Sequence, residues 1–238
     1  GQGVIISKGN PDGTFAAPTS VANLAAGANI LTVADYNGDG ILDLVFSTPV
    51  GIAVSVAQGN LTYGPPMSAV AAGPATPFLS LVEVAPGDFN GDGHNDLALG
   101  VDGGILILLG NGNGGFASAD YYDAGHTVGV ASVSDFNGDG NPDVAVTVSA
   151  TYPRLLLGTG SGVFNLGPDQ NQSYSSQTPA SSLIAADFNG DARPDLLIVQ
   201  PSSQFPYGQS FVLFNTGNNT FSNPLAINAG PVLVADVN

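Results

Sequence analysis

The sequence has no cysteine, no tryptophan and only three cationic side chains, which are Lys8, Arg154 and Arg193. The absence of cysteine excludes disulfide bonds and thiol chemistry. Because three scattered cations cannot form a basic patch, binding to nucleic acid or to anionic membrane surfaces is not expected. No apolar run reaches about eighteen residues, so the sequence predicts no membrane-spanning helix and no membrane insertion.

What the sequence does contain is an Asp-rich motif of ten residues, present in four full copies. These read DYNGDGILDL from Asp35, DFNGDGHNDL from Asp88, DFNGDGNPDV from Asp135 and DFNGDARPDL from Asp187, and a fifth copy opens at Asp236. Successive copies start 53, 47, 52 and 49 residues apart. A period near fifty residues indicates a repeat architecture.

Each full copy has Asp at positions 1, 5 and 9 and Asn at position 3. These are hard oxygen ligands of the kind that Ca²⁺ prefers, and the backbone carbonyl of position 7 can add another. The pattern predicts four Ca²⁺ sites, one per loop, and the alternative is a set of Asx turns without a metal. The predicted side-chain ligands are Asp35, Asn37, Asp39 and Asp43; Asp88, Asn90, Asp92 and Asp96; Asp135, Asn137, Asp139 and Asp143; and Asp187, Asn189, Asp191 and Asp195. The predicted position-7 carbonyls belong to Ile41, His94, Asn141 and Arg193.

These loops concentrate the negative charge of the chain. Twelve of the nineteen acidic residues lie in them, and four bound Ca²⁺ ions would change the formal net charge from −16 to −8. The loops are not EF-hands, because their last acidic residue is at position 9 and a short apolar stretch follows it instead of a helix.

The fourth loop departs from the others at position 6, where Ala192 replaces the glycine of the first three copies. This position is expected to need a positive φ, which costs Ala about 1 kcal/mol or more. Arg193 next to it also brings a cation close to the metal. We therefore expect the Asp187 loop to be the weakest of the four sites.

Short β-rich stretches bounded by Gly and Pro surround each loop, and no helical periodicity is present. One strand leads into the loop, a second follows it, a third precedes a Gly/Asn-rich hairpin, and a fourth follows the hairpin. Examples are 29–34 and 128–134 for the first strand, 44–47 and 144–148 for the second, 52–57, 105–109, 155–157 and 211–214 for the third, and 117–122 for the fourth. The aromatic residue that closes each hairpin is expected to pack between sheets; these residues are Phe15, Tyr63, Phe116, Phe164 and Phe221.

Four strands in every fifty residues predict an all-β fold, a single β-propeller domain of four-stranded antiparallel blades. Full blades are placed at about 28–79, 80–127, 128–180 and 181–229, with partial blades at 1–27 and 230–238. Joined together, the two partial blades would still lack one strand. We therefore expect a fragment of a larger ring; the alternatives are a five-bladed closure and completion of the open blade by another chain.

The loop D-x-N-G-D-G-x-x-D-L/V, followed by a strand and a hairpin ending in G-x-G-x-F, resembles the FG-GAP or VCBS repeat. That family includes the integrin α-subunit propeller, a fungal propeller lectin and many secreted bacterial proteins. The resemblance implies a Ca²⁺-binding β-propeller that is secreted or lies at the cell surface and serves adhesion or the binding of sugars and proteins. It also implies that loop positions 1, 3, 5 and 9 hold the metal. The Gly-Ala-Pro element of the family is not clear in any repeat.

Groups suited to catalysis are scarce outside the loops. One cluster, Asp120-Tyr121-Tyr122-Asp123 with His126, contains acid–base groups, but we interpret it as solvated residues at the end of a strand. Glu83 is expected to line a solvated central channel, and the ring of His94 is expected to face water. The protein is therefore predicted not to be an enzyme.

The predicted function is that of an extracellular, lectin-like binding or adhesion module for glycans or proteins, with structural Ca²⁺. The alternative is a non-catalytic propeller domain of a larger secreted polysaccharide-degrading or structural protein. Because antiparallel strands alternate in direction, the Asp-rich loops and the hairpins should share one face of the propeller. The opposite face varies in sequence, and loops on a rigid scaffold carry function. The predicted ligand contacts on that face are Tyr152, Tyr174, Phe205 and Tyr207.

Overall fold

A computed structural model describes residues 4–21, 29–48, 51–71, 83–101, 103–124, 128–148, 152–168, 170, 180–200 and 209–228 of the chain. Within these residues, all regular secondary structure is β-strand. The strands form separate four-stranded antiparallel sheets, as the blades of a β-propeller do. The all-β propeller fold predicted from the repeats is confirmed.

Four sheets follow one pattern, in which four antiparallel strands are joined in chain order. The first sheet contains β3 (Asn29–Ala34), β4 (Asp43–Thr48), β5 (Gly51–Ser55) and β6 (Met67–Ala71). The second contains β7 (Glu83–Gly87), β8 (Asp96–Val101), β9 (Gly104–Gly110) and β10 (Phe116–Asp123). The third contains β11 (Val128–Ser134), β12 (Asp143–Val148), β13 (Tyr152–Gly158) and β14 (Phe164–Leu166). The fourth contains β15 (Ser182–Ala186), β16 (Asp195–Gln200), β17 (Gln209–Leu213) and β20 (Leu225–Asn228).

Two smaller pairs complete the described strands. β1 (Ile5–Ile6) and β2 (Thr19–Ser20) form a two-stranded sheet at the N-terminal end of the arc, and β18 (Asn215–Gly217) and β19 (Thr220–Phe221) form the hairpin of the fourth sheet. Each predicted strand lies within about three residues of an observed one. The four strands per repeat therefore follow directly from the sequence pattern.

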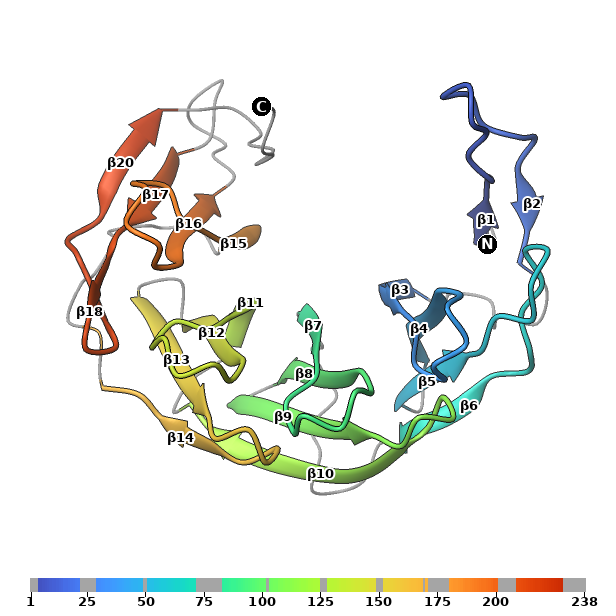
Figure 1. The fold of residues 1–238 in the computed structure, drawn as a ribbon, viewed down its shortest axis with the longest axis horizontal. Coiled ribbons are helices and arrows are strands. Elements are labelled where there is room, and N and C mark those ends of the chain that lie inside the picture. The colour runs from blue at the N-terminus through green and yellow to red at the C-terminus, as the bar shows by residue number, and fades with distance from the viewer. Residues whose placement is uncertain are drawn as a thin grey trace.

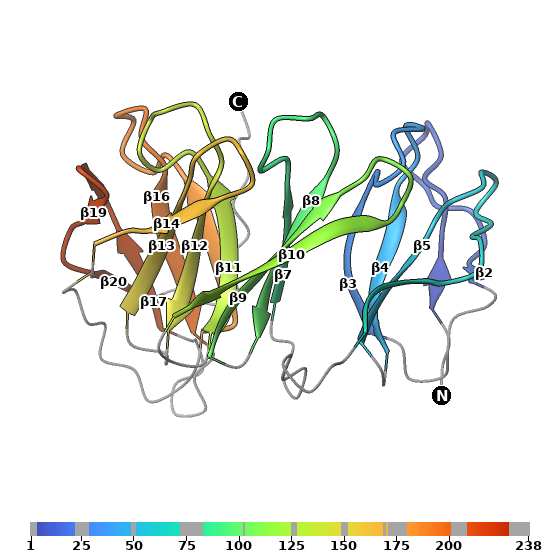
Figure 2. The ribbon, with the colours of Figure 1, turned by 90° about the horizontal axis from the view of Figure 1, so that it is seen from below.

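The sheets stand side by side in an open arc (Figure 1). The first strands of the sheets, β3, β7, β11 and β15, lie on its inner side, and the last strands, β6, β10, β14 and β20, lie on its outer side. Figure 2 shows the loops that follow β3, β7, β11 and β15 on the same face of the arc as the β9–β10 hairpin. The Asp-rich loops and the hairpins therefore share one face, as predicted.

The second strand of each blade is buried along nearly its whole length, because neighbouring sheets cover both of its faces. In β8, all six residues from Asp96 to Val101 are buried. This explains why these strands appear in the sequence as continuous apolar runs instead of alternating ones. A separate hydrophobic cluster fills each junction between neighbouring blades, and a fourth, containing Val21, Leu44 and Phe46, joins the β1–β2 pair to the first blade.

The hairpin aromatics are core residues at four of the five predicted positions. Phe164 and Phe221 are only 4% and 2% exposed, and Tyr63 and Phe116 are half-buried against hydrophobic clusters. The prediction is wrong for Phe15, which is 74% exposed. The physical reason is that the described residues contain no blade on the N-terminal side of its hairpin, so nothing covers the ring there.

Candidate metal centre

The Asp at position 1 organises the backbone of each loop. In the first loop, Oδ1 of Asp35 accepts a hydrogen bond from the amide of Gly38 at 2.8 Å, and Oδ2 accepts one from the amide of Gly40 at 2.7 Å. Asp88, Asp135 and Asp187 accept the corresponding bonds in their own loops. These bonds satisfy amides that a tight loop could not pair with its own carbonyls.

The side chains at positions 3 and 5 also turn towards the loop. Oδ1 of Asn37 accepts from the amide of Asp39 at 3.0 Å, and Oδ1 of Asp39 accepts from the amide of Ile41 at 2.8 Å. Nδ2 of Asn37 donates to the other carboxylate oxygen of Asp39 at 2.9 Å. The same three contacts occur in the other loops. Positions 1, 3 and 5 thus bring their oxygens to one small, curled segment.

This curl depends on positive φ angles at positions 4 and 6. In the first loop Gly38 and Gly40 have φ values of 75° and 82°. Ala192, which takes position 6 in the fourth loop, has a φ of 65°. The prediction that this position needs a left-handed conformation is therefore confirmed, and Ala192 is held in the region that Cβ disfavours.

The Asp at position 9 has a different environment, because it is the first residue of the second strand and is fully buried in all four loops. Oδ2 of Asp143 accepts from the amide of Phe136 at position 2 at 3.0 Å, and Oδ1 accepts from the amide of Gly158 at the end of the third strand at 2.8 Å. Asp43, Asp96 and Asp195 make the equivalent pair of bonds. This carboxylate joins the loop to two strands of its blade.

Burial and nearby charges raise the pKa of the position-9 carboxylates, whereas a backbone hydrogen bond lowers the pKa of Asp35 at position 1. Burial raises the pKa of Asp143 to about 6, and it raises the pKa of Asp43, Asp96 and Asp195 as well. For Asp43, the nearby charges of Asp39 and Asp35 raise the pKa further. At position 1, by contrast, the amide of Gly40 lowers the pKa of Asp35. Each loop therefore holds its ninth-position charge at an energetic cost.

The predicted ligands of each loop are all oxygen atoms, which are the ligands that a hard cation prefers. A carboxylate has about four lone-pair sites, and the two described hydrogen bonds of Asp43 leave room for a cation. Among the described residues, no three Asp, Glu, His or Cys side chains lie close enough together to hold a metal ion in this arrangement. Positions 1, 3 and 5 with the position-7 carbonyl would hold the ion, and the ninth carboxylate would complete the set.

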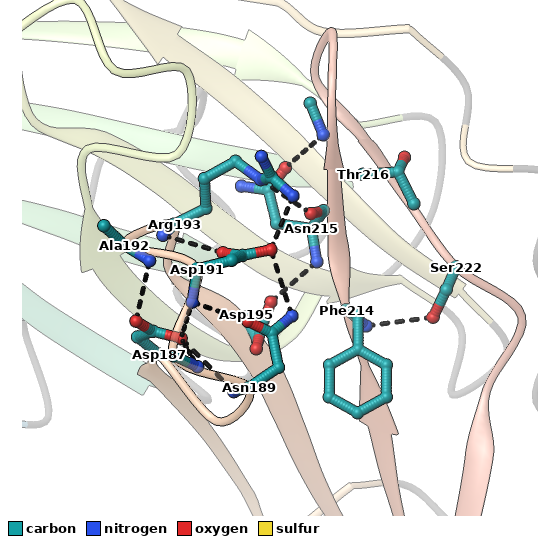
Figure 3. A network of polar contacts seen from close by, with 12 residues as sticks. Asp187, Asn189, Asp191, Ala192, Arg193, Asp195, Phe214, Asn215, Thr216 and Ser222 are labelled. Atoms are coloured by element: carbon teal, nitrogen blue, oxygen red, sulfur yellow. Dashed lines mark hydrogen bonds and ion pairs between the residues drawn. The ribbon is translucent and has the colours of Figure 1, made fainter.

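The fourth loop has a cation of its own (Figure 3). The guanidinium of Arg193 forms an ion pair with Asp191, and its Nε donates to the carbonyl of Asn215 at 3.0 Å. In turn, Nδ2 of Asn215 donates to the carbonyl of Phe136 in the preceding blade at 2.8 Å. Arg193 therefore engages Asp191, a predicted metal ligand, and the weakness of this site stays a prediction.

His94 lies differently from the prediction. Its ring is half-buried and lies directly against Gly112 of the β9–β10 hairpin, where an added Cβ would come within 2.4 Å of the ring. The ring therefore packs on the hairpin instead of simply facing water. In the sequence, only Gly112 could have indicated this contact, because a glycine leaves space for the imidazole of His94.

The structure describes only some of the residues predicted to belong to the acid–base cluster, the central channel and the ligand-binding face. Asp120 and Asp123 are exposed at the outer strand β10, and Tyr122 accepts a hydrogen bond from the amide of Phe164 at 3.0 Å, so its hydroxyl has a structural partner. Glu83 and Tyr152 begin β7 and β13, but only their backbones are described. His126, Tyr174, Phe205, Tyr207 and Asp236 lie outside the described residues. No helix in the described part of the chain is long and apolar enough to cross a membrane.

Sequence reasoning missed the role of position 2, which is aromatic in all four loops. The ring of Tyr36 packs against Phe116 of the next blade, and its carbonyl accepts from the amide of Gly114 at 3.0 Å. In addition, Nδ2 of Asn95 donates to the carbonyl of Asp35 at 2.8 Å. The repeated Tyr or Phe after the first Asp was the available signal. The loops thus contact neighbouring blades as well as their own.

Two segments of the chain match known repeat models. Residues 135–198 match the FG-GAP-like repeat, and residues 82–119 match the FG-GAP repeat. The resemblance inferred from the loop and hairpin motifs is thereby confirmed, and the chain carries FG-GAP repeats. A comparison with curated proteins finds no match.

Among solved structures, the chain is similar to a lectin of Agrocybe aegerita, described as showing specific recognition of non-reducing terminal N-acetylglucosamine. The two share 24% identity with a TM-score of 0.65 over 94% of this chain and 60% of the lectin chain. This chain therefore spans about 60% of the lectin's length, and the likeness establishes the fold. The chain is also 19% identical to the V. cholerae biofilm matrix protein Bap1, with a TM-score of 0.48 over 86% of this chain and 30% of the Bap1 chain.

The buried Asp143 predicts a particular pH dependence of the metal-free protein. Its pKa is raised from 3.8 to about 6, so ionisation of Asp143 lowers stability as the pH rises between these values. In EDTA, the wild type should lose about 2 kcal/mol relative to Asp143→Asn over this range. Urea denaturation at a series of pH values measures the difference.

Asp139→Asn is the matched control, because the amide of Asn141 lowers the pKa of Asp139. Relative to this variant, the wild type should instead gain stability as the pH rises. Slopes of the same sign would contradict this account.

Exchanging the position-6 residues of two loops tests the backbone argument. Gly140→Ala should destabilise the third loop by about 1 kcal/mol, because Ala in the left-handed region is strained, although the stiffer unfolded chain offsets part of this cost. Ala192→Gly should recover a similar amount in the fourth. Because Ala192 has a φ of 65°, the change should appear in the free energy of unfolding. Equal stability of both variants and the wild type would show that φ at position 6 does not matter.

Proposed function

We propose that this chain is a non-catalytic, glycan-binding propeller module that works outside the cell and is stabilised by Ca²⁺. The observation that carries the proposal is the repetition of one polar loop, with the same three carboxylates, four times on one face of the arc. A repeated element of this kind suits a structural role. Ligand binding would then take place on the opposite face, which varies in sequence.

Calcium is the cation that this donor set favours. All the donors are oxygens, the site is curled by glycines, and weak Ca²⁺ sites are common in extracellular modules. The ion would be held by positions 1, 3, 5 and 9 and by the carbonyl of position 7. It would supply positive charge where burial raises the pKa of the ninth-position Asp.

Glycan binding is supported by the likeness to a lectin whose structure shows recognition of terminal N-acetylglucosamine. A binding role also agrees with the scarcity of catalytic groups in the sequence. The ligand contacts we propose are Tyr152, Tyr174, Phe205 and Tyr207, because aromatic rings next to polar groups suit sugar rings. A role within a larger secreted protein is the second candidate, since the chain spans only 60% of the lectin chain.

A glycan array probed with and without Ca²⁺ tests the function. We expect binding to glycans with terminal N-acetylglucosamine or a related sugar in Ca²⁺, loss of binding in EDTA, and no turnover of the bound glycan. Tyr152→Ala, Tyr174→Ala and Tyr207→Ala should each weaken binding, while Asn113→Ala in the β9–β10 hairpin on the opposite face should not. Absence of any glycan binding, or loss only in the hairpin variant, would overturn the proposal.

A further inference from the structure

The sequence contains six Asn–Gly steps, at which an asparagine side chain can react with the backbone that follows it. In this reaction the backbone nitrogen of the glycine attacks Cγ of the asparagine, and the missing Cβ of glycine leaves the approach open. The steps occupy positions 3 and 4 of every Asp-rich loop and recur in the β9–β10 hairpin. They are Asn37–Gly38, Asn90–Gly91, Asn137–Gly138 and Asn189–Gly190 in the loops, and Asn111–Gly112 and Asn113–Gly114 in the hairpin.

In the loops, a carboxylate holds the attacking nitrogen. The amide of Gly38 donates to Oδ1 of Asp35 at 2.8 Å, and Nδ2 of Asn37 donates to Oδ2 of Asp39 at 2.9 Å. The other loops repeat both bonds. The glycine nitrogen must lose its proton to react, and a neighbouring negative charge disfavours that loss. The loop steps are therefore protected while the loop keeps its shape.

In the hairpin, the two steps differ from each other in the same respect. The amide of Gly114 donates to the carbonyl of Tyr36 in the preceding blade at 3.0 Å, and Gly114 is buried. The amide of Gly112 has no hydrogen-bond acceptor among the described residues, and Asn111 in front of it is exposed. All six steps lie in the described part of the chain, and only Asn111–Gly112 has a free attacking nitrogen there.

The side chain of Asn111 is also arranged for the attack. Its Oδ1 accepts hydrogen bonds from the amide of Asn113 at 3.2 Å and from that of Gly115 at 3.1 Å, the latter shared with Oδ1 of Asn113. Negative charge develops on Oδ1 of Asn111 as the nitrogen attacks Cγ, and fixed N–H groups stabilise such a charge. In each loop, Oδ1 of the asparagine accepts from a single amide, as Asn37 does from Asp39.

We propose that Asn111 is a self-modification site, at which the folded hairpin lets the side chain cyclise with the backbone of Gly112. The nitrogen of Gly112 loses its proton and forms a bond to Cγ of Asn111, while the Cγ–Nδ2 bond breaks and ammonia leaves. Water then opens the cyclic imide at either of its carbonyls, which gives aspartate or isoaspartate. The reaction consumes water, involves no oxidation or reduction, and is independent of the proposed function.

The two products act differently on the hairpin. Aspartate can accept the same backbone amides as Asn111 does. Isoaspartate adds a carbon to the main chain before Gly112, and this displaces Gly114. The amide of Gly114 binds the carbonyl of Tyr36, and an added Cβ on Gly114 would come within 2.5 Å of Val56. Formation of isoaspartate therefore loosens the junction between the first and second blades.

The experiment follows all six steps of the wild type in mildly alkaline buffer, in one folded sample and in one sample denatured in urea. Digestion with pepsin in acid stops the reaction, and mass spectrometry of the peptides detects replacement of the amide nitrogen by oxygen. Asn111 should react in the folded protein at least as fast as in urea. The other asparagines should react at least about tenfold more slowly when folded, because their glycine nitrogens must first lose a hydrogen bond. The ranking should be the same in Ca²⁺ and in EDTA.

Asn111→Gln is the matched control, because the longer side chain forms the corresponding ring far more slowly. It should abolish the modification at position 111 and leave the other steps unchanged. The proposal is overturned if the fold slows Asn111 as strongly as it slows Asn37, or if any other Asn–Gly step reacts faster than Asn111 in the folded protein. These comparisons use the wild type, so they stand even if the variant fails to fold.

The melting temperature of the aged protein tests the effect on the blade junction. The more acidic fraction that forms on ageing is separated by ion exchange and compared with the Asn111→Asp variant, which has the same charge and an unaltered main chain. The aged fraction should melt about 2–4 °C lower, the shift expected when a domain of this size loses one interaction. Equal melting temperatures would show that isoaspartate leaves the junction intact.

Discussion

The buried carboxylate at position 9 of each loop is the interaction on which the blade depends. In the third blade it binds the amide of Phe136 in the loop and the amide of Gly158 at the end of β13, while Asp143 itself begins β12. One side chain thus fixes the loop and two strands. The same side chain is a charge removed from water, and the charge of Asp139 raises its pKa further. A bound cation would offset that cost, which links the proposed metal to the geometry of the sheet.

Position 2 extends this dependence to the next blade. The amide of Phe136 is held by Asp143, its ring packs on Phe221, and its carbonyl accepts from Asn215. Phe136 therefore contacts both the buried carboxylate of its own loop and the neighbouring blade. Repetition of the same link at Tyr36 and Phe89 explains why the loops are almost identical from blade to blade.

The local features could be predicted from the sequence, because they depend on neighbours along the chain. The period of the Asp motif predicted the blades, and the apolar runs predicted the strands. Glycine at position 6 of three of the four loops predicted the positive φ that Ala192 adopts in the fourth. The ring of His94 and the exposure of Phe15 were predicted wrongly, because both depend on what another segment places beside them. The pair formed by loop and hairpin aromatics was missed for the same reason, since its partners are about eighty residues apart.

Thermal unfolding with and without chelator tests the link between metal and fold most directly. If Ca²⁺ compensates the loop carboxylates, EDTA should lower the melting temperature by at least about 5 °C, since a ligand bound only to the native state stabilises it by mass action. Added Ca²⁺ should restore the original value, and Mg²⁺ should restore it less well. A melting curve that is unchanged by EDTA and by both ions would show that the loops hold the blades together without a metal.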